Sequence, residues 1–228
     1  MREIVFDTET TGLSPAQGHR IVEIGCVELI NQLPTGRIYH QFINPQRKID
    51  DGAMRVHGIT NEFVADKPLF NQVVYDFLEF IGDAHLVAHN ATFDMGFVNH
   101  HLDELGMPTI SNERVVDTLV IARKRFAGAK NNLDALCQRF NIDISKRTKH
   151  GALLDAELLA DVYAELMGAG SNQRNLRFKE NKQESTDKTI SKVERKFIEP
   201  RKFNISDDEK QAHKELLSKI KEPLWESA

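Results

Sequence analysis

The sequence predicts an α/β domain with a central mixed sheet flanked by helices, followed by a flexible C-terminal tail. Strand-like segments dominate the first part of the chain, up to Ile43. Helical and strand-like segments then alternate from Leu69 to Met167, and the remainder is mainly polar and charged. Strands followed by alternating helices and strands are typical of a mixed sheet with helices packed on it.

The N-terminal segments have the composition of strands. They are rich in Ile, Val and Phe and lie at Ile4–Phe6, Arg20–Leu29 and Arg37–Ile43. Pro34–Gly36 is a turn signal between the last two. Because the connections are short, we expect an antiparallel meander.

The middle segments change to a helical period. Apolar spacing predicts helices at Leu69–Ile81, Phe93–Leu105, Leu119–Phe126, Leu133–Phe140 and Ala152–Met167. Short apolar runs predict further strands at His85–Ala88 and Val115–Val116. Asn90 or Thr92 is available to cap the helix that begins near Phe93.

The C-terminal part predicts a tether with a helix at its end. Gly168–Gly170 ends the last helix of the domain. The polar residues that follow predict a flexible linker. Ser206 and Glu209 form a capping box at the start of a further helical pattern. We therefore expect a domain in residues 1–167, a linker in 168–205 and a short helical segment in 206–228.

The composition is that of a globular chain, and it limits the classes of function. Of the 228 residues, 40% are hydrophobic and 28% are charged. Residues 1–167 hold 16 Lys and Arg against 23 Asp and Glu, a net charge of −7, so the domain is not a basic nucleic-acid clamp. The two cysteines form neither a disulfide framework nor a zinc pattern. No apolar run has the length of a membrane span, and we expect a cytoplasmic protein.

Two carboxylates follow the first apolar run. Asp7 and Glu9 lie two positions apart, and alternation along a strand directs both to the same side. Adjacent like charges are unfavourable unless a cation lies between them, and oxygen ligands suit Mg²⁺ or Mn²⁺. By itself, however, such a pair is most often an ordinary surface or turn pair.

Two further carboxylates strengthen the case for a metal site. Asp94 lies in the first turns of a predicted helix, and Asp155 lies early in the last one, on an otherwise apolar face. Burying an unpaired charge is costly. The sequence therefore predicts that the four carboxylates converge on two metal ions, which clamp the attacking and leaving oxygens of a phosphoryl transfer.

His150 is the candidate general base. It precedes Asp155 by five residues, which turn a helix by about 500°, so the two do not share a helix face. We expect His150 on the loop that enters the helix, where its ordinary pKa suits removal of a proton from the attacking water. Without the carboxylates, a solvated loop histidine would be the favoured interpretation. For Asp117, a fifth acidic candidate, a supporting role beside the metal ligands or a capping role is favoured over metal ligation.

The assembled residues resemble the DEDDh superfamily of 3′→5′ exonucleases, which has an RNase H-like fold. The resemblance lies in FDTETTGL, RIVEIG, VAHNATFDMGF and HGALLDAELLADVY. The stretches VHGIT, NNLDALCQRFNID and SKRTKHGALLDA are in addition similar to the proofreading epsilon subunits of bacterial DNA polymerase III. Together these stretches extend over essentially all of residues 2–167.

The resemblance implies a role for each matching position. Asp7, Glu9, Asp94 and Asp155 would bind two Mg²⁺ (or Mn²⁺) ions, and His150 would be the general base. The residues implied to contact the 3′-terminal nucleotide of DNA are Asp7, Thr8, Glu9, Thr10, Val56, His57, His89, Asn90, Phe93 and Asp155. Val56 and Phe93 would pack on the base, with plain core packing as the alternative.

The loop before VHG departs from the family pattern. Gly52 stands where a larger polar residue is expected, so a contact with the terminal sugar is lost or moves to Asp51. The basic runs Arg123–Arg125 and Lys146–Lys149 are candidates for contact with the phosphate backbone. Solvated faces are the alternative for both runs.

The tail resembles the partner-binding part of the same family. QRNLRF resembles a peptide that binds the sliding clamp (beta), with anchors at Gln173, Leu176 and Phe178. The apolar stripe with Trp225 would bind the alpha subunit of DNA polymerase III, with anchors at Leu216, Leu217, Ile220 and Trp225. Docking of this helix on its own domain is the alternative. The family also allows for a small accessory core subunit.

The sequence thus predicts a metal-dependent 3′→5′ exonuclease that proofreads DNA for a replicative polymerase. One alternative is a 3′ exoribonuclease of the same superfamily, although a free-standing nuclease does not need the tail. The other is a structural polymerase subunit without activity, against which the presence of all four carboxylates and His150 argues.

Overall fold

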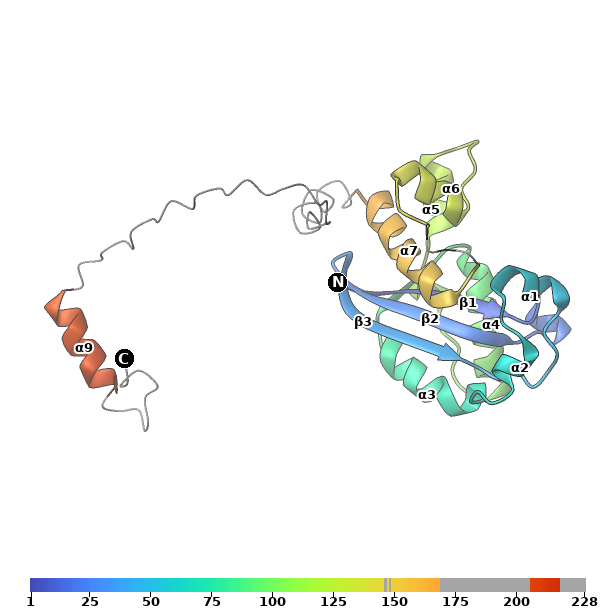
Figure 1. The fold of residues 1–228 in the computed structure, drawn as a ribbon, viewed down its shortest axis with the longest axis horizontal. Coiled ribbons are helices and arrows are strands. Elements are labelled where there is room, and N and C mark those ends of the chain that lie inside the picture. The colour runs from blue at the N-terminus through green and yellow to red at the C-terminus, as the bar shows by residue number, and fades with distance from the viewer. Residues whose placement is uncertain (146, 148, 169–205, 218–228) are drawn as a thin grey trace, which may run out of the picture. The chain divides into compact units, whose positions relative to one another are not determined.

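The computed structural model describes residues 1–145, 147, 149–168 and 206–217. The chain divides into two units, residues 1–183 and residues 184–228. The first unit contains the sheet and the helices that cover it (Figure 1). Among the described residues, no helix is both long and apolar enough to cross a membrane.

The sheet has five strands in the order β3-β2-β1-β4-β5. Their bounds are β1 (Arg2–Thr10), β2 (Ile21–Ile30), β3 (Leu33–Phe42), β4 (His85–Ala88) and β5 (Val115–Asp117). The first three strands are antiparallel neighbours, whereas β4 and β5 run parallel to β1. The predicted meander and mixed sheet are confirmed. Because β1 and β4 are parallel, their carboxyl ends lie at the same edge of the sheet, where α/β folds bind ligands.

Helices cover both faces of the sheet. Their bounds are η1 (Pro15–Gln17), α1 (Asp51–His57), α2 (Asn61–Val64), α3 (Phe70–Ile81), α4 (Ala91–Glu104), η2 (Asn112–Arg114), α5 (Thr118–Arg125), α6 (Leu133–Phe140), α7 (Ala152–Leu166) and, in the second unit, α9 (Asp207–Leu217). Figure 1 shows α3 and α7 on opposite sides of the strands.

The two faces of β1 carry different cores. Ile4 and Phe6 are fully buried in a cluster with α3 and α4. Val5, between them, is fully buried in a second cluster with α5, α6 and α7. Alternation along β1 therefore determines which helix layer each later side chain of the strand meets.

The turn between β2 and β3 differs from the prediction. Pro34–Gly36 lies inside β3, and the turn is formed by Asn31 and Gln32, both with positive φ (51° and 66°). Two left-handed residues give a turn whose twist matches that of the flanking strands. Pro34 is tolerated inside β3 because β3 is an edge strand of the sheet.

Two short helices, α1 and α2, were not predicted. Each has too few residues to show a helical period, and α1 contains Gly52. Ala53 and Met54 pack on a small core formed with Val22, Ile49, Ile59 and Val64. This tertiary packing holds α1 in position, and α1 carries Val56 and His57.

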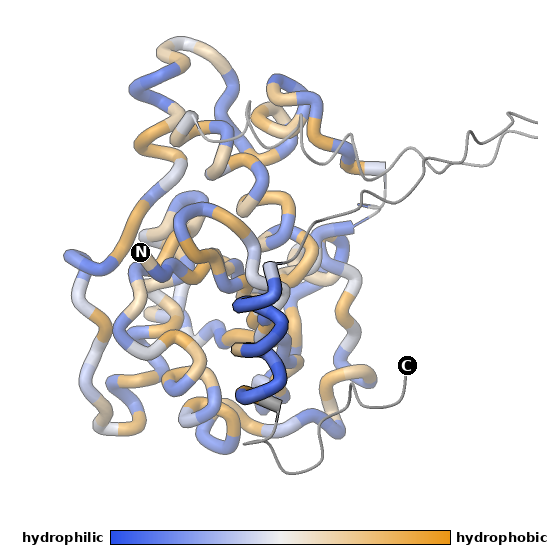
Figure 2. The backbone as a smooth tube through the Cα atoms, turned by 90° about the vertical axis from the view of Figure 1, so that its left-hand side faces the viewer, coloured by the Kyte–Doolittle hydropathy of each residue, from blue (hydrophilic) through white to orange (hydrophobic). Residues whose placement is uncertain are grey.

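The helix α9 confirms the predicted start of the C-terminal helix. The hydroxyl of Ser206 accepts from Glu209 N at 3.3 Å, and the Glu209 carboxylate accepts from Ser206 N at 3.0 Å, as in a capping box. Its residues are largely hydrophilic (Figure 2), and Leu216 is 60% exposed.

Candidate active site

β1 places two carboxylates on one face of the sheet. Asp7 and Glu9 continue the series begun by Val5, so they face the layer of α7. Both lie within β1, opposite Gly25 and Glu23 of β2, rather than beyond the end of a strand. Glu9 is 9% exposed and Asp7 is half-buried.

Asp94 reaches the same end of β1 from the first turn of α4. Its carboxylate accepts from the backbone N of Thr8 at 3.0 Å and from the hydroxyl of Thr8 at 2.6 Å. Asp94 is 2% exposed. Thr8 therefore attaches the start of α4 to the strand between the two carboxylates of β1.

Asp117 fixes the starts of two helices. One oxygen of its carboxylate accepts from Leu119 N at 2.8 Å, which caps α5, and from Asn90 N at 3.1 Å. Asn90 precedes α4 with a left-handed backbone (φ 69°), and the bond from Asp117 holds it there. This capping role agrees with the prediction.

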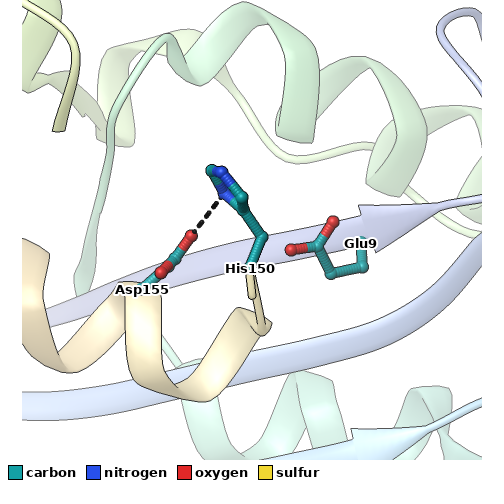
Figure 3. A group of neighbouring side chains, drawn as sticks. All are labelled: Glu9, His150 and Asp155. Atoms are coloured by element: carbon teal, nitrogen blue, oxygen red, sulfur yellow. Dashed lines mark hydrogen bonds and ion pairs between the residues drawn. The ribbon is translucent and has the colours of Figure 1, made fainter. Parts of the chain in front are cut away.

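Asp155 and His150 come from the start of α7. His150 lies on the loop that enters the helix, as expected, and its backbone N donates to Val56 O at 3.3 Å. The ring atom Nδ1 of His150 is 3.0 Å from Oδ2 of Asp155. Figure 3 shows both residues beside Glu9, and ligand atoms of the three lie within 4.8 Å of one another.

Gly25 allows α7 to approach this closely. A Cβ at this position would lie 2.2 Å from Leu153 N and 2.3 Å from the carbonyl carbon of Ala152. These are backbone atoms of the first turn of α7, which cannot give way as a flexible side chain can. The glycine of the RIVEIG stretch therefore places Asp155 opposite Asp7 and Glu9.

Arg147 is a buried cation at the carboxylate cluster. Its Nε donates to Oδ1 of Asp155 at 2.6 Å, and its Nη2 donates to Oδ2 at 2.7 Å. Nη2 also lies 2.7 Å from Nδ1 of His150, and Nη1 binds Asp134. The side chain is 7% exposed. The run Lys146–Lys149 was a candidate for phosphate contact, but this member of it points inward.

The cluster is rich in negative charge, and the pKa values reflect this. Burial, then the charges of Asp94, Glu9 and Asp155, holds the pKa of Asp7 well above its usual value. Burial and the charges of Asp155, Glu23 and Asp94 raise the pKa of Glu9 to about 8.

The net pKa shifts of Asp94 and Asp155 have opposite directions. Burial raises the pKa of Asp94 to about 7, although the bonds from Thr8 oppose it. Burial also acts to raise the pKa of Asp155, but bonds from His150 and Arg147 outweigh it and lower the pKa. Asp155 is thus kept ionised by Arg147 and His150, whereas burial and neighbouring carboxylates raise the pKa values of Asp7 and Glu9.

The residues fit a divalent cation. Carboxylate oxygens with a histidine nitrogen in reach form a donor set that Mg²⁺ or Mn²⁺ accepts. Burial is the main cause of the raised pKa values of Asp7, Glu9 and Asp94, and repulsion from neighbouring carboxylates adds to it. A cation between such charges removes that repulsion.

A cavity of about 460 Å³ opens beside Glu9. Five of the predicted substrate residues line it, namely Glu9, Thr10, Val56, His57 and Phe93. Val56 is 50% exposed, which favours the predicted role in packing on a base over core packing. Gly52 also lines the cavity, and a Cβ there would meet nothing within 4 Å.

His57 carries an unused donor. Its Nδ1 accepts from Ile59 N at 3.0 Å, and its Nε2 is buried without a hydrogen-bond partner among the described residues. Burial lowers the pKa of His57, although the nearby backbone of Thr10 acts to raise it, so the ring is neutral near pH 7 and its proton lies on Nε2. An unsatisfied buried donor in a cavity lining fits a ligand that accepts a hydrogen bond.

His89 and Asn90 do not line this cavity. The ring nitrogens of His89 are 2.8 Å from Thr118 Oγ1 and 2.8 Å from Asn131 O. A contact of His89 with substrate would require one of these bonds to break, and its substrate role stays a prediction.

Two residues near the site were missed by the sequence reasoning, Arg147 and Glu23. Glu23 is 4% exposed, lies opposite Glu9 in the strand register and is 2.7 Å from Nε2 of His40. Glu23 is recognised as a neighbour of the site only from the register between β1 and β2, which places it opposite Glu9. A pattern in the linear sequence does not give this register. In the sequence, Arg147 is only one of several charges in a basic run, and nothing in the pattern indicates that it is buried at the site.

Several predicted contacts of the tail lie outside the described residues. These are Gln173, Leu176, Phe178, Ile220 and Trp225, and the side chain of Leu217.

Arg125, in the predicted basic run Arg123–Arg125, donates to the carbonyls of Glu165 and Leu166 at 2.8 and 2.9 Å. It therefore caps the C-terminal end of α7.

Sequence comparison places relatives along nearly the whole chain. The family model described as RNase_T, an exonuclease family, matches residues 4–163. DNA polymerase III subunit epsilon of Rickettsia felis is 49% identical over 96% of this chain and 97% of its own length. The epsilon subunit of Escherichia coli K12 is 41% identical over 98% of this chain and 97% of its own.

Solved structures with the same arrangement of strands and helices include exonucleases. Exonuclease X in complex with 5′ overhanging duplex DNA has a TM-score of 0.57 and 28% identity, covering 74% of this chain and 93% of that one. The nuclease domain of 3′hExo, a DEDDh family member bound to rAMP, has a TM-score of 0.63 at 18% identity, covering 74% and 92%. The predicted RNase H-like fold is confirmed.

Proposed function

The chain belongs to the exonuclease family of the DNA polymerase III epsilon subunits, and we propose how its site removes mispaired nucleotides from DNA. It is a 3′→5′ exonuclease of the proofreading type. One observation supports the proposed site above all others. Asp7, Glu9, Asp94 and Asp155 meet at one edge of the sheet, with His150 beside them and a cavity adjoining Glu9.

The four carboxylates would hold two divalent cations, Mg²⁺ or Mn²⁺. When bound, the cations supply positive charge that favours ionisation of the attacking water and offsets charge on the leaving oxygen. Asp7 and Glu9 contribute from β1, Asp94 from α4 and Asp155 from α7. Because these elements pack on one another, the ligand positions are preorganised by the fold.

The cavity beside Glu9 binds the 3′-terminal nucleotide. Val56 and Phe93 pack on its base without reading sequence, as suits an enzyme that must remove any nucleotide. The Nε2–H of His57 donates to an oxygen of the nucleotide, which satisfies the unpartnered group.

His150 is the general base. It takes a proton from the water whose oxygen attacks the terminal phosphorus. The bond from phosphorus to the 3′ oxygen of the preceding nucleotide breaks, and a nucleoside 5′-monophosphate leaves. His150 is half-exposed and lies at the site edge, where its proton can pass on to solvent.

Single-turnover digestion of end-labelled substrates tests this function. Single-stranded, paired and mispaired DNA and the matching RNA are compared in Mg²⁺, with EDTA as the control. We expect loss of DNA nucleotides from the 3′ end, faster from mispaired than from paired ends, and none in EDTA. Preference for RNA would reassign the substrate, and unchanged cleavage by Asp7→Asn would reassign the site.

We propose further that the tail attaches the nuclease to its partners. The relatives are polymerase subunits, and a tethered nuclease has a high local concentration at the primer end. In this proposal residues 168–205 are the linker, residues 206–228 bind the polymerase alpha subunit, and Gln173, Leu176 and Phe178 bind the sliding clamp. A small accessory core subunit completes the assembly, which acts at the replisome in the cytoplasm.

Two binding measurements test the tail. A peptide of residues 200–228 should retain the polymerase in a pull-down, and no retention would contradict the tether. Gln173→Ala combined with Phe178→Ala should weaken clamp binding in a titration. Unchanged affinity would remove the clamp contact from the proposal.

A further inference from the structure

The guanidinium of Arg147 lies where a cation would bind Asp155. It forms a two-pronged contact with the carboxylate, Nε to Oδ1 at 2.6 Å and Nη2 to Oδ2 at 2.7 Å. Asp155 is 4% exposed, and the Arg147 side chain is 7% exposed. Charge-assisted paired bonds of this kind are among the stronger contacts in proteins.

This contact uses the same atoms that a metal ion needs. Asp155 forms the group with Glu9 and His150 whose ligand atoms lie within 4.8 Å of one another. A divalent ion at that edge would lie next to the guanidinium charge, where repulsion between cations in a buried site is large. The arginine and the ion therefore cannot both hold Asp155 in this geometry.

Arg147 also engages the proposed base. Nη2 lies 2.7 Å from Nδ1 of His150, and an arginine can only donate. In a neutral ring, Nδ1 either donates to Oδ2 of Asp155, 3.0 Å away, or accepts from Nη2 of Arg147, and in the second arrangement the ring proton lies on Nε2. In this arrangement His150 has no free lone pair with which to take a proton from water.

Asp134 gives the guanidinium a second anchor. Nη1 of Arg147 binds the Asp134 carboxylate, whose side chain is 47% exposed, at the start of α6. Asp134 lies outside the group of metal-ligand atoms. Arg147 can thus leave Asp155 without becoming an unpaired charge.

We propose that Arg147 is a positioning residue that serves as the resting-state counter-cation of the metal site and competes with the divalent ion for Asp155. Without metal, its charge stabilises the start of α7 and occupies both Asp155 and His150. When an ion binds Asp155, the guanidinium would leave this carboxylate, keep Asp134 as its partner and release Nδ1 of His150. The inference rests on the proposed function only in placing a divalent ion at Asp155.

Metal affinity of the full chain tests the competition without any cleavage assay. Mn²⁺ binding to the EDTA-stripped protein is measured by calorimetry for the wild type, Arg147→Gln and Arg37→Gln. Arg37 binds Glu28 and is 65% exposed, so its variant loses the same charge outside the cluster. We expect Arg147→Gln to bind Mn²⁺ about tenfold more tightly, equivalent to about 1.4 kcal/mol, and Arg37→Gln to match the wild type. Equal or weaker binding by Arg147→Gln would overturn the proposal.

A second measurement uses the unmodified chain, in case Arg147→Gln does not fold. The Nε–H of Arg147 is followed by nuclear magnetic resonance after assignment through its own side-chain carbons. Adding Mg²⁺ should shift this resonance as its bond to Asp155 is lost, whereas the Nε–H of Arg2, bonded to Glu28, should stay in place. An unmoved Arg147 resonance at saturating Mg²⁺ would overturn the proposal, whether or not the chain cleaves DNA.

Discussion

At the scale of single residues, the site concentrates carboxylates where burial opposes their charge. Glu9 has a pKa of about 8 and Asp94 a pKa of about 7 in the folded protein. Both values exceed those of an unfolded chain, so the folded state binds protons that the unfolded state has released. Without metal, this difference lowers stability as the pH rises from the unfolded values to the folded ones.

The first prediction concerns pH and metal. In EDTA, the unfolding temperature should fall as the pH rises from about 5 to about 8, since each proton held only by the folded state is worth about 1.4 kcal/mol per pH unit. The lowered pKa of Asp155 acts in the opposite sense and only in acid, where stability is lost as the pH falls through the folded value.

Thermal unfolding with and without Mg²⁺ measures this effect. Glu9→Gln removes one of the carboxylates with a raised pKa. The unfolding temperature of this variant in EDTA should therefore depend less steeply on pH than that of the wild type. Mg²⁺ should restore stability most at the alkaline end, because the ion binds the ionised carboxylates. A flat profile in EDTA would show that burial and neighbouring charges do not raise the pKa values of Glu9 and Asp94 in the folded protein.

The second prediction concerns His150. His150→Gln should lower the single-turnover rate by about 10²–10⁴-fold, the usual contribution of a general base, and abolish the fall of the rate in acid. His100→Gln serves as the control, since His100 lies near the far end of α4 and pairs with Glu104. A rate-against-pH profile unchanged by His150→Gln would assign the base to another group.

At the scale of elements, the approach of α7 to β2 decides where the site forms. Gly25 lies under the first turn of α7, where any Cβ would meet backbone. Asp155 is in that turn, whereas Asp7 and Glu9 are on the adjacent strand. The separation between the carboxylates is thus set by helix–sheet packing through one glycine.

The third prediction compares two glycines. Gly25→Ala should lower the free energy of unfolding by about 3 kcal/mol, the cost of overpacking against a rigid neighbour, and reduce Mn²⁺ affinity as Asp155 moves away. Gly96→Ala is the matched control, because Gly96 is in α4 and a Cβ there meets nothing within 4 Å. It should raise the free energy of unfolding by up to about 1 kcal/mol. Chemical denaturation measures both, and equal effects would contradict the packing argument.

At the scale of the whole molecule, the catalytic parts belong to the unit that contains the sheet. The segment from β1 to the first turn of α7 contains all proposed metal ligands, the proposed base His150 and the residues that line the cavity. Arg125 caps the end of α7 from within the same unit. The core and the site described for this unit consist of residues from 1–168.

The fourth prediction follows from this division. A chain of residues 1–168 should keep the unfolding temperature and the single-strand exonuclease rate of the full chain but lose binding to the polymerase. Calorimetry, digestion of a labelled oligonucleotide and a pull-down measure the three properties. A large drop in unfolding temperature would show that the tail packs on the domain, the alternative reading of the C-terminal helix.

The sequence by itself determined what depends on near neighbours along the chain. The spacing of Asp7 and Glu9 fixed their common face, and the period of the later segments located α3 and α7. The capping box at Ser206 marked the start of α9. These features follow from backbone geometry and local hydrogen bonding, so a linear pattern carries them.

Only the tertiary structure decided what depends on long-range packing. The left-handed turn at Asn31 and Gln32, the position of Glu23 opposite Glu9 and the buried direction of Arg147 each depend on contacts between distant segments. The free Nε2 of His57 and the engaged ring of His89 likewise depend on which neighbours the fold supplies. Local patterns state which charges a segment carries, but only packing determines which of them are buried together.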